Sequence, residues 1–397
     1  MKYLDLVILA GGKGTRIKDF TNNKPKPLAK IGNYTFLDLL LGSISKYHFR
    51  KIFILAGYKG KQIYKKYHNK NINFMNIECV IEKEPLGTGG SLNVIKNKLT
   101  KDFFVINGDT IADFNFYEML KLKKNNNLVI ALTKSKFNYN GNKINNLFFN
   151  KSKNIEINND NGRNNFKSAG VCLLSKSFFN NLNKNKFSLE NEIIFKLIQK
   201  KKAYALTKKF FFYDIGTKKD FINAKNKLLK HLSRPAIFLD RDNTINSDKG
   251  YTYNFNDFKF INNSIKALKY ASDKNLYIFI VTNQAGIAKG YFKEKDFIDL
   301  HIKLKKKFLF NKIFINDVKY CPYHPKAKLL TYKKRSGLRK PGNLMIKQVL
   351  KKWVIKEKNS IMIGDQIKDQ KCAEKSNINF KFVEKDLLEQ LKNLKFF

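Results

Sequence analysis

The sequence passes from an apolar run into a glycine-rich segment at Leu9-Ala10-Gly11-Gly12-Lys13-Gly14-Thr15-Arg16. The run before it, residues 3–9, is apolar enough to predict a buried strand. Glycines let a backbone approach a phosphate closely, and successive amides in such a turn can point toward an anion. The segment therefore predicts either a phosphate-binding loop after the first strand or a plain tight turn.

Short apolar runs alternate with helical patterns through the first half of the chain. We expect buried strands at residues 3–9, 51–56, 77–81, 102–106 and 128–132. Helices are expected at residues 36–47, 89–98 and 115–124. This alternation is typical of a mostly parallel sheet covered on both faces. The asparagine-rich stretch 138–166 predicts a hairpin excursion or a lid.

A second α/β series follows a break at Ser233-Arg234-Pro235. Strands are expected at residues 236–239, 276–281, 360–363 and 379–383, and helices at residues 263–272, 293–308 and 344–351. The two series share no sequence repeat, and 397 residues with 43% hydrophobic content suffice for two cores. The sequence therefore predicts two different doubly wound α/β domains, residues 1–232 and 233–397.

The net charge of +46 does not by itself indicate a nucleic-acid-binding protein. All but seven of the 78 basic residues are lysine, and they are spread along the chain and interleaved with asparagine. A genome rich in A and T gives this pattern, because AAA and AAT encode lysine and asparagine. We expect no nucleic-acid partner, although such charge would steer phosphorylated substrates toward the protein.

The chain also lacks the features of a secreted or membrane protein. No apolar stretch approaches 18 residues, and Asp5 interrupts the first apolar run where a signal peptide would be uncharged. The four cysteines have no paired spacing. We expect a cytoplasmic protein with no membrane partner, and the sequence leaves its oligomeric state open.

Four further segments extend the pattern set by the glycine-rich turn. They are Lys24-Pro25-Lys26-Pro27-Leu28, Glu84-Pro85-Leu86-Gly87-Thr88-Gly89-Gly90, Val105-Ile106-Asn107-Gly108-Asp109 and Tyr213-Asp214-Ile215-Gly216-Thr217. Prolines on both sides of Lys26 would hold its charge stiffly. In this order the segments resemble the signature of the sugar-1-phosphate nucleotidyltransferases, which implies a Rossmann-like domain with a mixed sheet.

The resemblance also implies roles for individual residues. Asp109 and Asp214 would hold a Mg²⁺ ion, since carboxylate oxygens suit this cation, and Arg16 and Lys26 would supply catalytic charge. The nucleotide would be bound by Gly11, Gly12, Gly14, Thr15, Gly87, Thr88 and Gly89. Ligands collect at the carboxyl ends of parallel strands, where Asp109 is expected.

The sugar side is similar to the D-glycero-D-manno-heptose 1-phosphate guanylyltransferases. The similarity lies in Ser168-Ala169-Gly170-Val171 and Phe187-Ser188-Leu189-Glu190. It implies that the Gly170 backbone and the Glu190 carboxylate contact sugar hydroxyls and that GTP is the nucleotide donor. Residues 150–166 depart from the pattern, because the glutamate–lysine pair that many relatives use near the sugar has no counterpart there.

In the second half, Asp240 and Asp242 stand two residues apart just past an expected strand. One carboxylate can attack phosphorus while the other protonates the leaving oxygen. Three segments follow: Val281-Thr282-Asn283-Gln284, Arg339-Lys340-Pro341 and Ile363-Gly364-Asp365-Gln366-Ile367-Lys368-Asp369. Together they resemble the four motifs of the haloacid dehalogenase phosphatases.

By this resemblance Asp240 is the nucleophile, and Asp242 is the general acid and then the general base. Thr282 and Lys340 would hold the phosphoryl group. A second Mg²⁺ would be held by Asp240, Asp242, Asp365 and Asp369. The short intervals after Asp242 and Thr282 leave no room for a large cap domain.

Residues 283–292 are similar to the corresponding run of the D-glycero-D-manno-heptose 1,7-bisphosphate 7-phosphatases, and the histidinol phosphatases remain an alternative. Zinc is not expected, although relatives often carry it. Tyr323, Ser336 and Leu338 stand where three of its ligands would be, which leaves Cys321 and His324 without the four ligands that a structural zinc needs.

Taken together, these patterns predict a bifunctional enzyme of heptose activation with GTP and phosphorylated heptose as substrates. Two alternatives stay open. One is a nucleotidyltransferase for another sugar, such as mannose 1-phosphate, or another base, such as uracil. The other is a basic nucleic-acid-binding or regulatory protein on a degenerate enzyme scaffold. Intact candidate residues in both halves argue against degeneration.

Overall fold

The computed structural model describes residues 4–123, 128–134, 147–150, 152–157, 166–180 and 184–394. The chain divides into two compact units. One comprises Met1–Ser43 and Phe49–Asn226, and the other Ile44–His48 and Lys227–Phe397. Both are α/β, as the sequence predicts, while the boundary between residues 232 and 233 stays a prediction.

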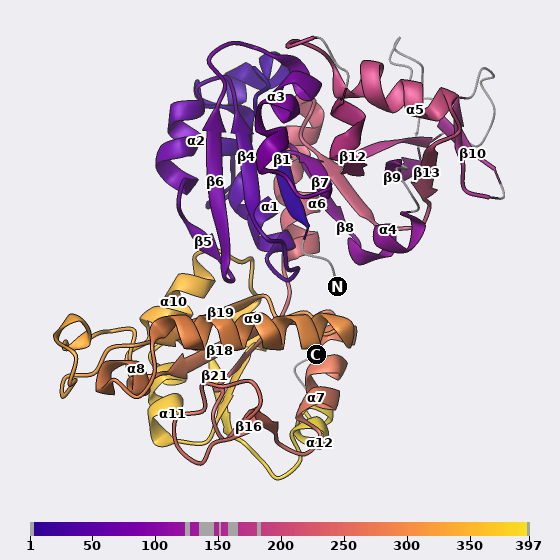
Figure 1. The fold of residues 1–397 in the computed structure, drawn as a ribbon. Coiled ribbons are helices and arrows are strands. Elements are labelled where there is room, and N and C mark those ends of the chain that lie inside the picture. The colour runs from indigo at the N-terminus through magenta and orange to yellow at the C-terminus, as the bar shows by residue number, and fades with distance from the viewer. Residues whose placement is uncertain are drawn as a thin grey trace. The chain divides into compact units, whose positions relative to one another are not determined.

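The first unit is built on a mixed sheet (Figure 1). Its parallel centre has the order β7-β1-β4-β6, formed by Asp102–Asn107, Asp5–Leu9, Ile52–Ala56 and Met75–Ile81. Strand β12 (Phe166–Ser175) pairs antiparallel with β7 and with β9 (Leu128–Lys134), and β13 (Ala203–Leu206) pairs parallel with β9. The short strands are β5 (Asn71–Ile72), β10 (Leu147–Phe149) and β11 (Ile155–Ile157). Separate pairs join β2 (Lys30–Ile31) to β3 (Tyr34–Thr35) and β8 (Thr110–Asp113) to β14 (Phe211–Asp214).

Helices of the first unit follow the strands closely. They are α1 (Phe36–Ile44), α2 (Gly60–Tyr67), α3 (Gly87–Ile95), α4 (Tyr117–Leu122), α5 (Phe195–Gln199) and the first part of α6 (Lys218–Leu232), whose residues after Asn226 belong to the second unit. Apolar side chains of α3 and α5, such as Leu92 and Ile198, share one core with Val7 and Val105 of the sheet. The core buries apolar area that stabilises the fold by roughly 25 cal/mol per Å². It also fixes the carboxyl ends of the central strands next to one another.

The second unit has a parallel sheet in the order β19-β18-β15-β20-β21. The strands are Asp317–Cys321, Tyr277–Asn283, Ala236–Leu239, Ile361–Gly364 and Asn379–Phe382. Strand order reverses between β15 and β20, and open α/β sheets bind their ligands at the carboxyl edge of such a switch point. Asp240 and Asp365 directly follow these two strands.

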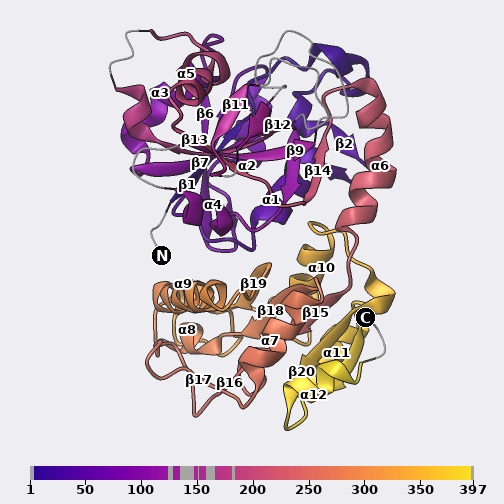
Figure 2. The ribbon, with the colours of Figure 1, turned by 90° about the vertical axis from the view of Figure 1, so that its right-hand side faces the viewer.

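Helices cover both faces of this sheet (Figure 2). Side chains of α10 (Leu344–Leu350) and α11 (Ile367–Glu374) form one core with Phe238 and Phe279. Helix α7 (Ser264–Asp273) packs against α12 (Leu387–Lys392), while α8 (Ala285–Lys289) and α9 (Glu294–Phe310) follow β18. Over residues 184–394, which are all described, only the β16–β17 pair (Asn246–Ser247 and Lys259–Phe260) is inserted before α7, so the expected absence of a large cap is confirmed.

The structure refines several predicted elements. Helix α3 begins two residues before the predicted start at residue 89, and the predicted helix at 115–124 shortens to α4. The predicted hairpin between residues 138 and 166 is present as the antiparallel β10–β11 pair, and the rest of that stretch lies mostly outside the described residues. Strands β12 and β19 were not predicted, because their residues mix polar and apolar types without a clear period.

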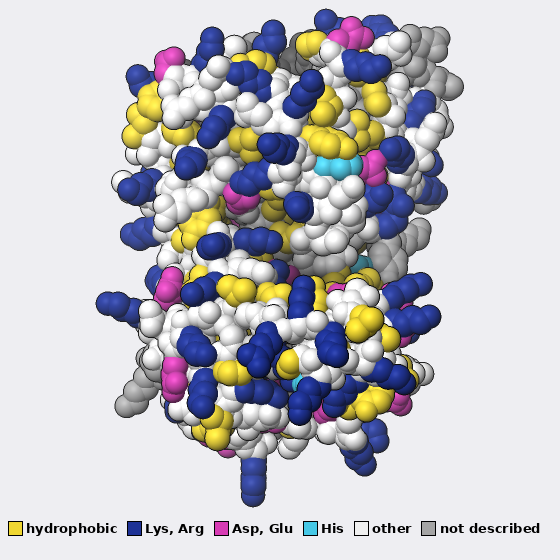
Figure 3. Space-filling view, turned by 90° about the vertical axis from the view of Figure 1, so that its left-hand side faces the viewer, with side chains coloured by type: hydrophobic (Ala, Val, Ile, Leu, Met, Phe, Trp, Pro, Cys, Tyr) yellow, Lys and Arg dark blue, Asp and Glu magenta, His cyan; other side chains and the backbone are white. Residues whose placement is uncertain are grey.

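Charge on the face drawn in Figure 3 is as dispersed as it is in the sequence. On the face drawn in Figure 3, Lys and Arg side chains lie scattered among other residues and do not gather in one basic stripe. Within the described part of the chain, no helix has the length and the apolar character needed to cross a bilayer.

Candidate active sites

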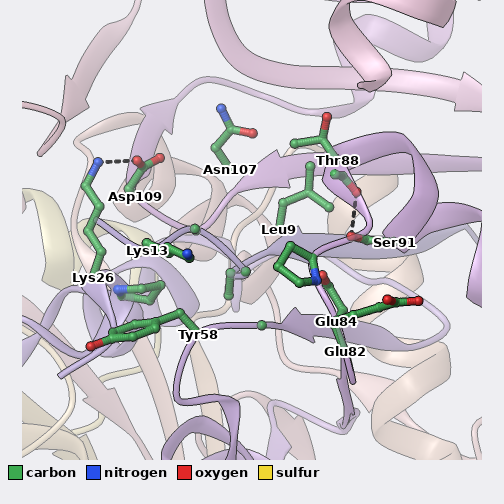
Figure 4. A pocket seen from close by; sticks show the side chains of 18 of the residues that line it. Leu9, Lys13, Lys26, Tyr58, Glu82, Glu84, Thr88, Ser91, Asn107 and Asp109 are labelled. Carbon is green, nitrogen blue, oxygen red and sulfur yellow. Dashed lines mark hydrogen bonds and ion pairs between the residues drawn. The ribbon is translucent and has the colours of Figure 1, made fainter. Parts of the chain in front are cut away.

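A cavity of about 580 Å³ opens at the carboxyl ends of the central strands in the first unit (Figure 4). The glycine-rich turn after β1 and the segment Asn107 to Asp109 after β7 form part of its wall. Residues 82–91, which run from the end of β6 into α3, supply Glu82, Gly87 and Thr88. The cavity therefore lies where a parallel sheet is expected to bind a ligand.

Lys26 and Asp109 form an ion pair within this cavity (Figure 4). The Lys26 side chain is only 10% exposed and that of Asp109 30%. Gly14 makes this packing feasible, since its φ is +62° and a Cβ there would stand 3.1 Å from Lys26 Cβ. The turn thus seats a nearly buried cation beside the carboxylate.

Asp214 lies close to Asp109 because strands β8 and β14 pair antiparallel. The backbone N–H of Ile215 donates to the carbonyl oxygen of Asp109 at 3.1 Å. Burial, followed by the charge of Asp109, raises the pKa of Asp214. Two adjacent carboxylates that repel each other suit a divalent cation, so Asp109 and Asp214 fit Mg²⁺.

Thr88 and Glu190 connect the two walls of the cavity. Thr88 Oγ1 donates to Glu190 Oε2 at 2.6 Å and accepts from the backbone N–H of Leu189 at 2.9 Å. Glu190 begins a π-helical turn, Glu190–Ile194, a rare geometry that often marks functional sites. Gly87 and Gly89 allow this approach, because a Cβ at either position would fall within 2.5 Å of Phe187.

In the second unit, Asp240, Asp365 and Asp369 converge at the switch point. One carboxylate oxygen from each lies within 4.8 Å of the others. Asp365 Oδ1 is buried and has no hydrogen-bond partner. A buried carboxylate oxygen without a partner is costly unless a cation meets it, so these residues fit Mg²⁺.

Lys340 lies completely buried against this cluster. Its Nζ contacts Asp240 Oδ2 at 2.9 Å and Asp369 Oδ1 at 2.6 Å, and it donates to the carbonyl oxygen of Val281 at 2.8 Å. Burial alone would lower the pKa of Lys340, but the two carboxylates outweigh it and raise that pKa. Lys340 is therefore a fixed positive charge beside the candidate nucleophile.

Asp242 and Thr282 meet through Gln284. Gln284 Nε2 donates to Asp242 Oδ2 at 3.0 Å and to Thr282 Oγ1 at 2.9 Å. Burial raises the pKa of Asp242, with Arg241 opposing this and Asp240 adding to it. A carboxyl group with a raised pKa is suited to donate a proton near neutral pH.

Comparison with known proteins relates each half of the chain to a protein family. Residues 6–139 match the family described as Nucleotidyl transferase, and residues 312–383 match the Haloacid dehalogenase-like hydrolase family. The D-glycero-beta-D-manno-heptose-1,7-bisphosphate 7-phosphatase of Haemophilus influenzae is 39% identical over 138 residues, which is 35% of this chain and 74% of that protein. The chain is a nucleotidyltransferase fused to a haloacid dehalogenase-like phosphatase. Its phosphatase domain belongs to the family of these 7-phosphatases.

Further similarities extend over each domain. The D-glycero-alpha-D-manno-heptose-1,7-bisphosphate 7-phosphatase of Campylobacter jejuni is 36% identical over 166 residues, which is 40% of this chain and 91% of that protein. Among solved structures, HddC from Yersinia pseudotuberculosis is 26% identical, with a TM-score of 0.48, over 57% of this chain and 99% of that one.

The nucleotidyltransferase cavity gathers about half of the site residues predicted for that domain. Those that line it are Gly11, Gly12, Lys26, Gly87, Thr88, Asp109 and Glu190. Those outside its lining are Gly14, Thr15, Arg16, Gly89, Gly170 and Asp214. Arg16 is exposed, while Gly170 has a φ of +66° and lies where a Cβ would meet Asn107 Nδ2 at 2.8 Å. The catalytic role of Arg16 therefore stays a prediction without a contact to support it.

The phosphatase site brings all of its predicted residues together. Asp240, Lys340 and Asp369 are in direct contact, while Asp242 and Thr282 share Gln284, which was not predicted. In the nucleotidyltransferase cavity the sequence analysis also missed Tyr58 and Glu82. Glu82 directly follows β6, and its place at the carboxyl end of a central strand is the signal that would have found it.

The side chains of Cys321 and His324 contact the neighbouring backbone, and the expectation that no zinc binds here stays a prediction. Cys321 Sγ donates to the carbonyl oxygen of Tyr323, and His324 Nδ1 accepts from the backbone N–H of Lys326 at 3.0 Å. Within the described residues, the Asp240–Asp365–Asp369 group is the only cluster of three or more potential metal ligands. The following loop is held by Glu294, whose carboxylate accepts from the hydroxyls of Tyr320 and Tyr332 at 2.7 and 2.9 Å.

Proposed function

We propose that this protein removes the 7-phosphate of D-glycero-D-manno-heptose 1,7-bisphosphate and transfers GMP from GTP to the resulting heptose 1-phosphate. One observation carries the proposal: the phosphatase domain spans most of a heptose bisphosphate 7-phosphatase and brings its predicted catalytic residues together. The nucleotidyltransferase domain would then use the product of the phosphatase. Both reactions are placed in the cytoplasm, where nucleoside triphosphates are made.

Phosphate release proceeds in two steps at Asp240. A carboxylate oxygen of Asp240 attacks phosphorus, the bond to the C7 oxygen breaks, and Asp242 protonates that oxygen to give the alcohol. Asp242 then takes a proton from water, whose oxygen attacks phosphorus and displaces Asp240, releasing phosphate. Lys340 stabilises the phosphoryl oxygens, and Thr282 donates its hydroxyl to them. Asp240, Asp365 and Asp369, with Asp242 beside them, would hold a Mg²⁺ ion, which would supply positive charge to the phosphoryl group.

The second phosphate of the substrate has a candidate partner in Arg339. Its Nη1 is buried without a hydrogen-bond partner, and Arg339 directly precedes Lys340. Lys289 lies close enough to Arg339 for the two positive charges to repel each other. Guanidinium groups bind phosphate with two parallel hydrogen bonds, so Arg339 supports a bisphosphate over a monophosphate.

Nucleotidyl transfer needs no covalent intermediate. A phosphate oxygen of heptose 1-phosphate attacks the α-phosphorus of GTP, and the bond to the leaving pyrophosphate breaks. Backbone amides of Gly11 and Gly12 bind the phosphates, and Lys26 neutralises the charge that develops on them. Asp109 and Asp214 would hold Mg²⁺, which would supply further positive charge against the phosphates.

Glu82 supports guanine as the base. Its carboxylate lines the cavity, and a Cβ on Gly11 would stand 3.0 Å from Glu82 Oε1. An ionised carboxylate only accepts hydrogen bonds, and the Watson–Crick edge of guanine presents two adjacent donors, N1–H and the 2-amino group. Uracil presents one donor between two acceptors, which a carboxylate would repel. Glu190 and the Gly170 backbone remain the candidates for contacts to sugar hydroxyls.

The test is to incubate the purified protein with heptose 1,7-bisphosphate, Mg²⁺ and one nucleoside triphosphate at a time, and to identify the products by mass. We expect one phosphate, one pyrophosphate and a GDP-heptose with GTP alone. A product with UTP in place of GTP would overturn the assignment of the base. Release of phosphate from histidinol phosphate, with none from the heptose, would overturn the assignment of the sugar.

A further inference from the structure

Arg241, between the two catalytic aspartates, is among the largest fully buried side chains of the protein. A buried guanidinium is costly unless it is paired and its donors are satisfied. The carboxylate that pairs with it is that of its own neighbour, Asp242. The mechanism above gives Arg241 no part, although its charge lies beside the group that moves the proton.

The two neighbours face each other because the chain turns immediately after β15. In an extended strand, successive side chains point to opposite faces and would not meet. Here the backbone N–H groups of Thr244, Ile245 and Asn246 all donate to the carbonyl oxygen of Arg241. Asn243 makes the turn possible with a φ of +57°, which asparagine tolerates better than most residues.

The contact between Arg241 and Asp242 is a bidentate ion pair. Arg241 Nε donates to Asp242 Oδ1 at 2.8 Å, and Nη2 donates to Oδ2 at 3.1 Å. A planar guanidinium that binds both oxygens fixes the plane of the carboxylate as well as its position. A lysine would leave the carboxylate free to rotate about its last bond.

Arg241 is itself held rigidly. Nη2 also donates to the carbonyl oxygen of Thr252 at 2.8 Å, and the guanidinium lies over the Phe297 ring at 5.5 Å. His301 Nε2 faces Nη1 at 3.5 Å. Burial, and then the charge of Arg241, lowers the pKa of His301, so the ring is neutral, while Arg241 pairs with Asp242 and its charge also acts on Asp248.

We propose that Arg241 is a positioning residue that sets the orientation of the Asp242 carboxyl for proton transfer to the leaving oxygen, with Gln284 as its partner on Oδ2. The proposal rests on the proposed phosphatase function, in which Asp242 is the general acid. Arg241 does not touch the phosphoryl group. Its effect should therefore depend on how much the leaving group needs a proton.

The test compares two substrates that differ in this need. A sugar alkoxide leaves poorly without a proton, and heptose 1,7-bisphosphate provides one. A 4-nitrophenolate leaves readily as the anion, and 4-nitrophenyl phosphate provides it. General acid catalysis contributes roughly 10²- to 10⁴-fold, so Asp242→Asn should lose about that factor in kcat/KM on the alkyl substrate and far less on the aryl one, because kcat/KM does not include the later hydrolysis of the aspartyl phosphate.

Arg241→Met should follow the same pattern to a smaller degree. We expect kcat/KM on the alkyl phosphate to fall about 10- to 100-fold while kcat/KM on the aryl phosphate stays within about threefold. Arg241→Lys restores the charge without the bidentate contact and should be intermediate. The control is Arg234→Met, because Arg234 is also buried and donates to Asn275 Oδ1, but it precedes β15 at the opposite end from Asp242.

Equal losses on both substrates for Arg241→Met, as for the control, would overturn the proposal and make Arg241 structural. If Arg241→Met does not fold, Gln284→Leu replaces it as the test, because this change removes one hydrogen-bond donor to Asp242 Oδ2. A ratio of alkyl to aryl kcat/KM that is unchanged from wild type would then overturn the proposal. A wild-type protein that cleaves only other alkyl phosphates, such as mannose 6-phosphate, refutes the heptose assignment, and the ratio is then measured with that substrate. A wild-type protein without any phosphatase activity refutes the proposed function and this inference with it.

Discussion

Replacing Lys26 by methionine removes the cation from the nucleotidyltransferase cavity and preserves the length of the side chain. Methionine keeps the apolar stem that packs against Gly14. The ion pair with Asp109 is lost, and Asp109 and Asp214 are left as neighbouring carboxylates without that charge. The change therefore separates the contribution of the charge from that of the packing.

The size of the effect follows from burial. Breaking an exposed ion pair costs up to about 1 kcal/mol and breaking a buried one about 3–5 kcal/mol. With Lys26 10% exposed and Asp109 30% exposed, we expect a loss of stability of about 2 kcal/mol, which a domain of ordinary stability tolerates. Loss of one preorganised charge from a transition state lowers kcat roughly 10²- to 10³-fold.

The pH dependence should also change. The charge of Lys26 opposes the rise in the pKa of Asp214, so removing it should raise that pKa further. If Asp214 binds the metal as a carboxylate, transfer activity is lost as pH falls through this pKa, and the acidic limb should move to higher pH in the variant. In the free protein, a carboxyl pKa above its unfolded value stabilises the fold below the unfolded pKa, and this contribution is lost as pH rises through the folded pKa.

The assay is pyrophosphate release from GTP and heptose 1-phosphate, measured across pH. The control is Lys24→Met, because Lys24 lies two residues away but is exposed and outside the cavity lining. Phosphate release by the second domain reports whether each variant is intact. If Lys26→Met keeps more than a tenth of wild-type transfer activity, the cation does not stabilise the transition state.

The remaining predictions concern the independence of the two sites, zinc, the loop held by Glu294 and the order of the two reactions. Asp240→Asn should abolish phosphate release and leave transfer to preformed heptose 1-phosphate nearly intact, while Asp109→Ala should do the reverse; a folded variant that loses both activities would contradict two independent sites. Protein purified without chelator should contain no stoichiometric zinc, and Cys321→Ser should turn over normally; one tightly bound zinc per chain would show this zinc prediction to be wrong. Glu294→Ala should loosen the adjacent loop and raise KM for the phosphatase. Phosphate removal should precede transfer, because a remaining 7-phosphate would bring a dianion to a pocket that contains Glu190; efficient formation by Asp240→Asn protein of a GDP-heptose that keeps the 7-phosphate would reverse this order.

The strands that carry the sites could be predicted from sequence, but the side-chain contacts within each site could not. Strands β1, β7, β15 and β20 are buried apolar runs, which are visible in any sequence, and the motif residues follow directly at their ends. Side-chain contacts across the fold leave no local pattern. Thr88 and Glu190 are 102 residues apart, and only the folded chain shows that one holds the other.

Residues that act through others were the hardest to predict. The glycines at positions 87 and 89 were assigned to nucleotide binding, but the structure shows that they also make room for Phe187. Gln284 belongs to a predicted motif, yet its link between Asp242 and Thr282 depends on the turn after β15. A sequence motif indicates that a residue is important, but it does not show which neighbouring side chain that residue contacts.

The two domains share one electrostatic arrangement although they share no sequence repeat. In each, a carboxylate that follows a parallel strand lies near a second carboxylate from another element, and a nearly buried lysine pairs with one or both: Lys26 with Asp109, and Lys340 with Asp240 and Asp369. Clustered carboxylates repel one another and would take up protons if no cation were present. In each domain the charge of the lysine opposes the rise in pKa that burial and a neighbouring carboxylate cause at Asp214 and at Asp369. In the proposed mechanism each lysine would also pair with the incoming phosphate, so one charge would serve the empty site and the occupied site in turn.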